Sequence, residues 1–109
     1  MGDVDEGEVF EVTVDETATS TRMALRGDLD IATARTLEAE VTARRPFRSP
    51  LVLDVAQLTF VDSSGLRSLT AVRRAAVEDV AQPVTLVGCR PNLRTLLELT
   101  GLEDAFEYA

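Results

Sequence analysis

The sequence predicts an α/β fold in which helices flank a mostly parallel, mixed sheet of four to five strands. Strand-like and helix-like segments alternate between residues 20 and 100, as expected of parallel strands joined by helices. The connections in this region are long enough for right-handed crossovers. Two short and almost wholly apolar runs, at 51–55 and 83–88, are typical of buried strands, the first of a strand covered on both faces.

The first half of the chain predicts two strands followed by a helix. Residues 9–14 alternate loosely between apolar and polar side chains, and residues 20–27 place apolar side chains on one face, so we expect a hairpin or neighbouring strands. Two prolines within 45–50 end the helix that follows. That helix, over 30–44, has Asp30 suited to its N-cap and apolar side chains at helical spacing at Ile31, Ala34, Leu37 and Val41.

The second half predicts two further strands, two helices and a short edge strand. After the strand at 51–55, the helix over 65–80 has an inward face formed by Leu66, Leu69, Val72, Ala76 and Val80. The strand at 83–88 precedes a helix over 91–101, which has a proline in its first turn and a glycine suited to end it. Residues 105–108 are predicted to form the edge strand.

Composition and charge narrow the classes of function. An apolar fraction of 45% with 28% charged residues is typical of a globular protein, and we expect one domain over 1–109. The net charge is −8 and every basic residue is an arginine, so a nucleic acid is a poor candidate partner. Seven acids fall within residues 3–16, and we expect residues 1–8 to form an acidic, flexible lead that aids solubility.

The sequence also predicts a cytoplasmic protein without cofactors. No apolar run is long enough to cross a bilayer, and the first residues lack the features of a signal peptide. We therefore expect no membrane partner. A single cysteine, Cys89, fits a reducing compartment, and its spacing to Arg94 is one residue too short for a cysteine phosphatase loop, so we expect it to pack at a strand end. The sequence has no His/Cys cluster that would bind a transition metal and no Gly-rich loop that would bind a nucleotide.

Two acidic turns are the candidate functional sites. Residues 27–33 and 61–66 each follow a predicted strand and lead into a helix, and loops at the carboxyl ends of strands carry function in open α/β sheets. In the second turn, Asp62 or Ser63 can cap the helix. Gly65 either lets the chain turn tightly or allows a close approach that a side chain would obstruct.

Ser63 has three interpretations on the residues alone. As a helix cap it is structural, which residue statistics favour. As a nucleophile it lacks a base, because the chain has neither histidine nor lysine. As a phosphate acceptor it stands at a helix N-terminus that favours added negative charge, while Asp62 and the acids of the first turn oppose it. The cap and the acceptor remain open, and they are compatible.

The segments GDLDIATARTL, LVLDVAQLTFVDSSGLRSL and NLRTLLELTGLEDAF together resemble the STAS domain, specifically the bacterial anti-sigma factor antagonists. The resemblance spans about residues 9–108 in the same order and with similar spacing. It implies helices on one side of the sheet and a role in partner switching. The antagonist binds an anti-sigma factor that is also a serine kinase and so releases a sigma factor. Phosphorylation by that kinase ends the complex, and a serine phosphatase restores the antagonist.

The resemblance also implies the site residues. The phosphorylated serine matches Ser63, and Asp30 matches an acid that helps partner binding. Arg67 departs from the family, in which a glycine is common there; it either pairs with a phosphate, alters which partner docks, or is a solvated arginine. We expect the following residues to form the partner-binding site: Asp28, Asp30, Thr33, Asp62, Ser63, Ser64, Gly65, Leu66 and Arg67.

A second class of function remains open. STAS domains also serve as structural subunits of stress-signalling assemblies and as accessory subunits of lipid transporters. A structural subunit should elute as a large assembly, whereas an antagonist should elute as a monomer or weak dimer. Enzyme catalysis has no supporting residues in the sequence.

Overall fold

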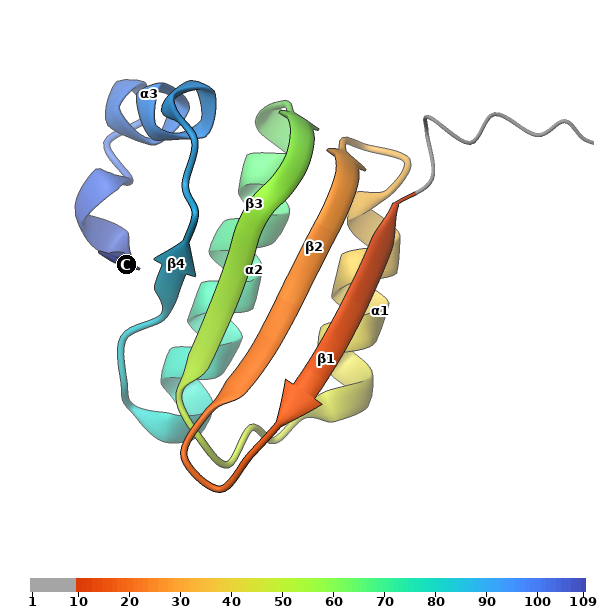
Figure 1. Ribbon diagram of the computed structural model, residues 1–109, viewed down its shortest axis with the longest axis vertical. Coiled ribbons are helices and arrows are strands. Elements are labelled where there is room, and N and C mark those ends of the chain that lie inside the picture. The colour runs from red at the N-terminus through yellow and green to blue at the C-terminus, as the bar shows by residue number, and fades with distance from the viewer. Residues whose placement is uncertain (1–9) are drawn as a thin grey trace, which may run out of the picture.

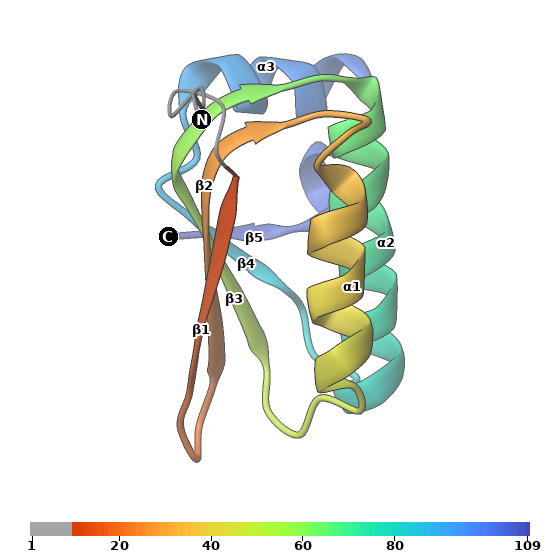
Figure 2. The ribbon, with the colours of Figure 1, turned by 90° about the vertical axis from the view of Figure 1, so that its right-hand side faces the viewer.

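The computed structural model describes residues 10–109 and contains a five-stranded sheet in the order β1-β2-β3-β4-β5 (Figure 1 labels β1 to β4, and Figure 2 also β5). β1 is antiparallel to β2, and all other neighbouring strands are parallel, which confirms the predicted α/β class and mixed sheet. The expected acidic lead over 1–8 lies outside the described residues. The elements are β1 (Glu11–Glu16), β2 (Thr21–Leu29), α1 (Ala34–Arg44), β3 (Leu51–Val61), α2 (Ser63–Val80), β4 (Thr85–Val87), α3 (Pro91–Leu99), a 3-10 turn η2 (Glu103–Ala105) and β5 (Glu107–Tyr108).

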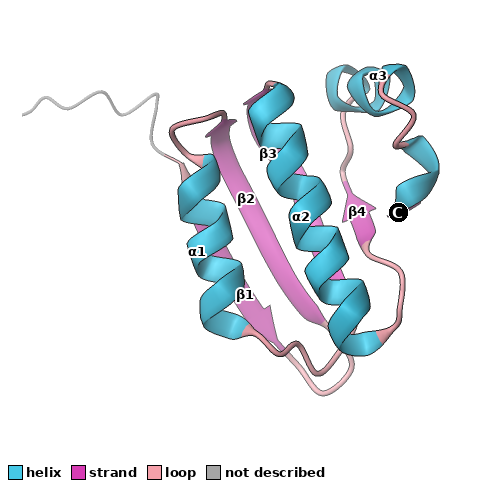
Figure 3. Cartoon of the chain, turned by 180° about the vertical axis from the view of Figure 1, so that it is seen from behind, coloured by secondary structure: helices cyan, strands magenta, loops and turns pink. Residues whose placement is uncertain are grey.

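Helices α1 and α2 cover one face of the sheet (Figures 2 and 3). Side chains on that face, such as Met23 and Leu53, are fully buried. On the opposite face, Arg22 and Asp54 form an ion pair at 2.9 Å. The prediction that the first apolar run is covered on both faces is therefore wrong. Val52 is half-buried without a helix above it, because in an inner strand the side chains of both neighbouring strands shield it.

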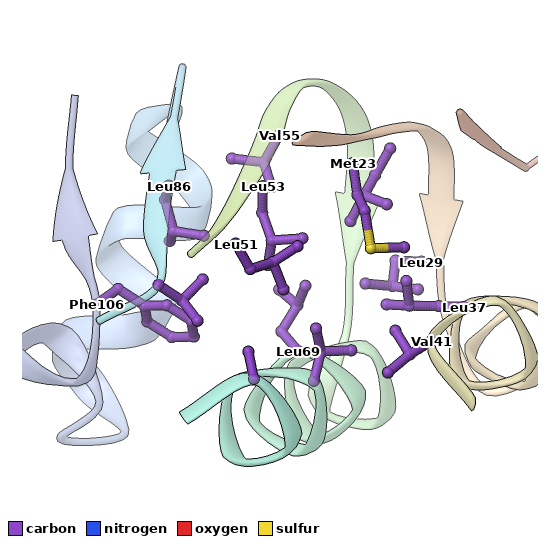
Figure 4. Packing of buried hydrophobic residues seen from close by; sticks show 14 of the residues in the cluster. Met23, Leu29, Leu37, Val41, Leu51, Leu53, Val55, Leu69, Leu86 and Phe106 are labelled. Carbon is purple, nitrogen blue, oxygen red and sulfur yellow. The ribbon is translucent and has the colours of Figure 1, made fainter. Parts of the chain in front are cut away.

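The core fills the space between the sheet and the two helices (Figure 4). Leu69 from α2 and Leu37 from α1 meet the strand side chains there, and the predicted inward face of α2 is buried except for Val80, which is half-buried against the core. Ile31 is an exception to the predicted α1 face, since it is 74% exposed. It lies in the turn before α1, which begins only at Ala34.

Several boundaries differ from the prediction. β2 continues to Leu29 and β3 to Val61, so Asp28 lies in a strand rather than in a turn. The register between these strands shifts twice, each time with an extra residue in β3, and such bulges interrupt the alternation by which β3 could be recognised in the sequence. β1 begins at Glu11, later than the predicted start at residue 9. Residue 9 itself lies outside the described part of the chain.

The predicted strand at 83–88 is reduced to the three residues of β4. α3 begins with Pro91 and ends before Gly101, whose φ is +75°, as the sequence predicts. β5 pairs with β4 at the edge of the sheet, which confirms the predicted edge strand, although it covers only the last two of the four predicted residues.

Candidate functional site

The two predicted turns meet at the carboxyl end of the sheet. Parallel strands β2 and β3 are neighbours and end together, with Leu29 paired to Val61. The backbone N–H of Asp62 then donates to the carbonyl of Leu29 at 3.3 Å, which ties the start of α2 to the end of β2. Figure 1 shows the loops that follow these strands at the same end of the molecule. The structure therefore brings together two segments that are distant in sequence.

Asp62, rather than Ser63, caps α2. The helix begins at Ser63, and the Asp62 carboxylate accepts a hydrogen bond from the N–H of Gly65 at 2.8 Å. This geometry satisfies one of the free N–H groups of the first turn. Ser63 is exposed, and its hydroxyl forms no hydrogen bond with the described part of the chain, whereas the neighbouring Ser64 is half-buried. The hydroxyl of Ser63 is thus available for another role.

Gly65 allows a close approach between α2 and β2. It lies within the first turn of the helix, so the alternative that it forms a tight turn is wrong. A Cβ atom at this position would stand 2.2 Å from the carbonyl oxygen of Leu29 and 2.9 Å from its carbon. The next residue, Leu66, is only 5% exposed and belongs to the core. Gly65 and Leu66 therefore pack the first turn of α2 against β2 and the core.

The first turn is ordered by its own side chains. Asp30 does not cap α1, because the helix begins four residues later, with Thr33 at the N-cap position. Instead the Asp30 carboxylate accepts from the N–H groups of Ala32 at 3.0 Å and Thr33 at 3.1 Å. The Thr33 hydroxyl donates to the carbonyl of Asp28 at 2.6 Å. The Asp28 carboxylate accepts from the hydroxyl of Thr59, also at 2.6 Å.

A hollow of about 340 Å³ opens beside Ser63, between α2 and the segment that follows α3. Arg67 lines it, is exposed, and forms no ion pair with any of the described residues. Of the hollow's eight lining residues the sequence analysis named three, and it missed three more on α2 and the two contributed by the segment after α3. The hollow is lined by Ser63, Leu66, Arg67, Thr70, Ala71, Arg74, Thr100 and Leu102.

Three large apolar side chains are exposed near this end of the sheet, and the sequence analysis assigned them no surface role. Ile31 in the first turn is 74% exposed, and Phe60 near the end of β3 is 49% exposed. Leu99 is 79% exposed and belongs to α3, which lies at the same end of the molecule (Figures 1 and 2). A surface that mixes apolar side chains with acids and hydroxyls suits contact with another protein.

Cys89 packs against the core after β4, as predicted. Burial raises the pKa of its thiol, and the nearby Arg94 opposes that shift only in part. Within the described residues, no cluster of His, Cys, Asp or Glu could hold a metal ion. That same part of the chain has no helix with the length and apolar character needed to span a membrane.

Comparison with known proteins identifies the family. The model described as "Mlab, STAS domain" matches residues 12–107, so the chain belongs to the STAS domain family, which confirms the resemblance. No curated protein matches the chain.

Solved structures share the fold. An anti-sigma factor antagonist from Mycobacterium paratuberculosis has a TM-score of 0.71 at 23% identity, covering 92% of this chain and 85% of that one. The anti-sigma factor antagonist SpoIIAA in its unphosphorylated form has a TM-score of 0.73 at 24% identity, covering 93% and 88%. The phosphorylated form of the Bacillus cell fate determinant SpoIIAA has a TM-score of 0.69 at 22% identity, covering 93% and 91%. At these identities the likeness establishes the fold alone.

Proposed function

We propose that this protein is a cytoplasmic anti-sigma factor antagonist that phosphorylation of Ser63 switches off. The unmodified protein binds an anti-sigma factor that is also a serine kinase, and so releases a sigma factor. The kinase then transfers the γ-phosphoryl group of ATP to the Ser63 oxygen, with loss of the hydroxyl proton and release of ADP. A serine phosphatase restores the unmodified form. The antagonist itself catalyses no reaction.

One observation carries this proposal. Ser63 is exposed, and its hydroxyl has no hydrogen-bond partner among the described residues, because Asp62 caps the helix in its place. A serine that stabilised the fold would use its hydroxyl. The existence of a solved SpoIIAA structure in a phosphorylated form supports phosphorylation as a control in a protein of the same fold.

The predicted site residues differ in exposure: Ser63 and Arg67 are exposed, Gly65 and Leu66 are buried, and the others are half-buried. A partner pressed against this end would meet the more exposed group first, and phosphorylation would add about −1.5 to −2 charges at its centre. We propose direct contact for the exposed Ser63 and Arg67 and for the half-buried Asp30 and Ser64. We propose a supporting role, shaping the two turns and holding α2 against β2, for Asp28, Thr33, Asp62, Gly65 and Leu66.

The test is a pull-down from the protein's own cells, followed by kinase assays with the partner recovered. Wild-type protein should capture a serine kinase and gain one phosphate with ATP, mapped to Ser63 by mass spectrometry. Ser63→Ala should capture the same kinase and gain none, and Ser64→Ala, the matched control for the phosphate acceptor, should still gain one phosphate. A phosphate on Ser64 or Thr33 would refute the site assignment.

A second candidate function is a structural STAS subunit, either of a stress-signalling assembly or accessory to a lipid transporter. The exposure of Ile31, Phe60 and Leu99 favours it, since a permanent partner would cover such side chains. Size-exclusion chromatography of native extracts separates the two candidates. A large, stable assembly that persists without regard to phosphorylation would support the subunit, whereas a monomer or weak dimer would support the antagonist.

A further inference from the structure

Arg67 stands one helical turn after Ser63 on the same face of α2. Four residues of helix advance about 6 Å along the axis, and side chains at this spacing are neighbours. Both residues line the same hollow. The Arg67 side chain is exposed and forms no ion pair with the described residues, so its guanidinium is available to an added anion.

The hollow is basic in an otherwise acidic chain. Its lining includes two arginines and no acid, although the chain carries a net charge of −8. The second arginine, Arg74, lies eleven residues after Ser63, which corresponds to about 16 Å along the helix axis. Arg74 is therefore an arginine on the same helix face as Arg67 and lines the same hollow. It is nevertheless too far along the helix to reach a group on Ser63.

The charged side chains of the two turns are all acidic. Asp62 precedes it, with a carboxylate that accepts from the N–H of Gly65, and the Asp30 carboxylate accepts from N–H groups of its own turn. Across the hollow, Thr100 and Leu102 carry no charge. The two acids would repel a phosphate on Ser63. Of the two arginines that line the hollow, Arg67 is the one within one helical turn of Ser63.

We propose that Arg67 binds the phosphate of phosphorylated Ser63 and holds it over the hollow as an intramolecular clamp. This inference rests on the proposed function, in which Ser63 is the phosphate acceptor. The planar guanidinium donates two N–H groups to phosphate oxygens, a geometry that arginine favours. The clamp neutralises part of the new charge within the protein and fills the hollow. A partner that binds this surface then loses both its contact with Arg67 and the space in the hollow.

The experiment uses full-length protein with phosphoserine encoded at position 63 during translation, so that no kinase is required. The phosphorus NMR signal is titrated to obtain the second pKa of the phosphate in wild type, Arg67→Gln and Arg74→Gln. We expect Arg67→Gln to raise that pKa by about 0.5 to 1 unit, because the cation no longer stabilises the dianion. Arg74→Gln, the matched control, should stay within about 0.2 units of wild type.

Two results would overturn the clamp: an unchanged pKa in Arg67→Gln, or an equal rise in both variants, which would indicate a general field. Both substitutions are on the exposed face of α2, and circular dichroism checks that the variants remain folded. The titration is independent of the cellular kinase. A failed kinase assay at Ser63 would refute the proposed function, whereas an unchanged titration would refute the clamp alone.

Discussion

Replacing Gly65 by alanine tests whether the start of α2 at Ser63 depends on the close approach of α2 to β2. The Cβ of the variant would stand 2.2 Å from the Leu29 carbonyl oxygen. A close C···O contact is about 3.3 Å, so the helix start must retreat by roughly 1 Å. The obstructing atoms belong to the backbone at the end of a strand, and that strand cannot rotate away as a side chain can.

The expected loss of stability is about 1–3 kcal/mol. Overpacking typically costs about 1–3 kcal/mol, and alanine returns up to about 1 kcal/mol of helix propensity. The retreat also strains the hydrogen bond from Asp62 N–H to the Leu29 carbonyl, a loss of about 0.5–1.5 kcal/mol. Gly65→Val should be worse than Gly65→Ala, since it adds two methyl groups to the same contact.

Urea unfolding measures the change, with binding to the recovered kinase as a second readout. Gly101→Ala is the matched control. The φ of Gly101 is +75°, but a Cβ added there would meet no atom within 4 Å beyond its chain neighbours. This variant should therefore lose about 1–2 kcal/mol of stability through backbone strain and bind as wild type does. Gly65→Ala should weaken both stability and binding. A Gly65→Ala midpoint and affinity equal to wild type would refute the reasoning.

Three further outcomes are expected from other contacts of α2. Phosphorylation of Ser63 should weaken kinase binding by two to three orders of magnitude, roughly 3–4 kcal/mol. Ser63→Asp should weaken binding less than the phosphate does, and Ser63→Ala should stay bound to the kinase when ATP is present. Equal affinities of the modified and unmodified protein by calorimetry would contradict this. Asp62→Ala should lose about 1 kcal/mol in urea unfolding through the lost cap, while Asp62→Asn should retain most of it. Asp79→Asn should lower the melting temperature at pH 7 more than Glu78→Gln, because Arg45 bonds Asp79 at 2.8 Å and Glu78 at 3.3 Å. Arg45 holds the pKa of Asp79 below its usual value, so this difference should be complete at neutral pH and shrink as the pH falls below about 4; a constant difference down to pH 2 would contradict it.

The sequence was sufficient for the order and type of the elements, and less so for their limits. Helix α2 was predicted well because its inward side chains repeat at regular spacing over many residues. The end of β3 was missed because two register shifts break its alternation. The start of α1 was misplaced because Asp30 has the side chain of a cap, yet it bonds N–H groups of the turn that precedes the helix.

The same division applies to the site. The sequence alone located the serine turn after a buried strand, excluded a catalytic triad and indicated two acidic turns at one edge of a sheet, because these depend on residue type and local spacing. Only the tertiary structure decided that Asp62 takes the cap and leaves Ser63 free, that Gly65 is required by the Leu29 carbonyl, and that Arg67 shares a hollow with Thr100 and Leu102. Those facts depend on how closely segments distant in the chain approach each other, and packing of the whole core sets that distance.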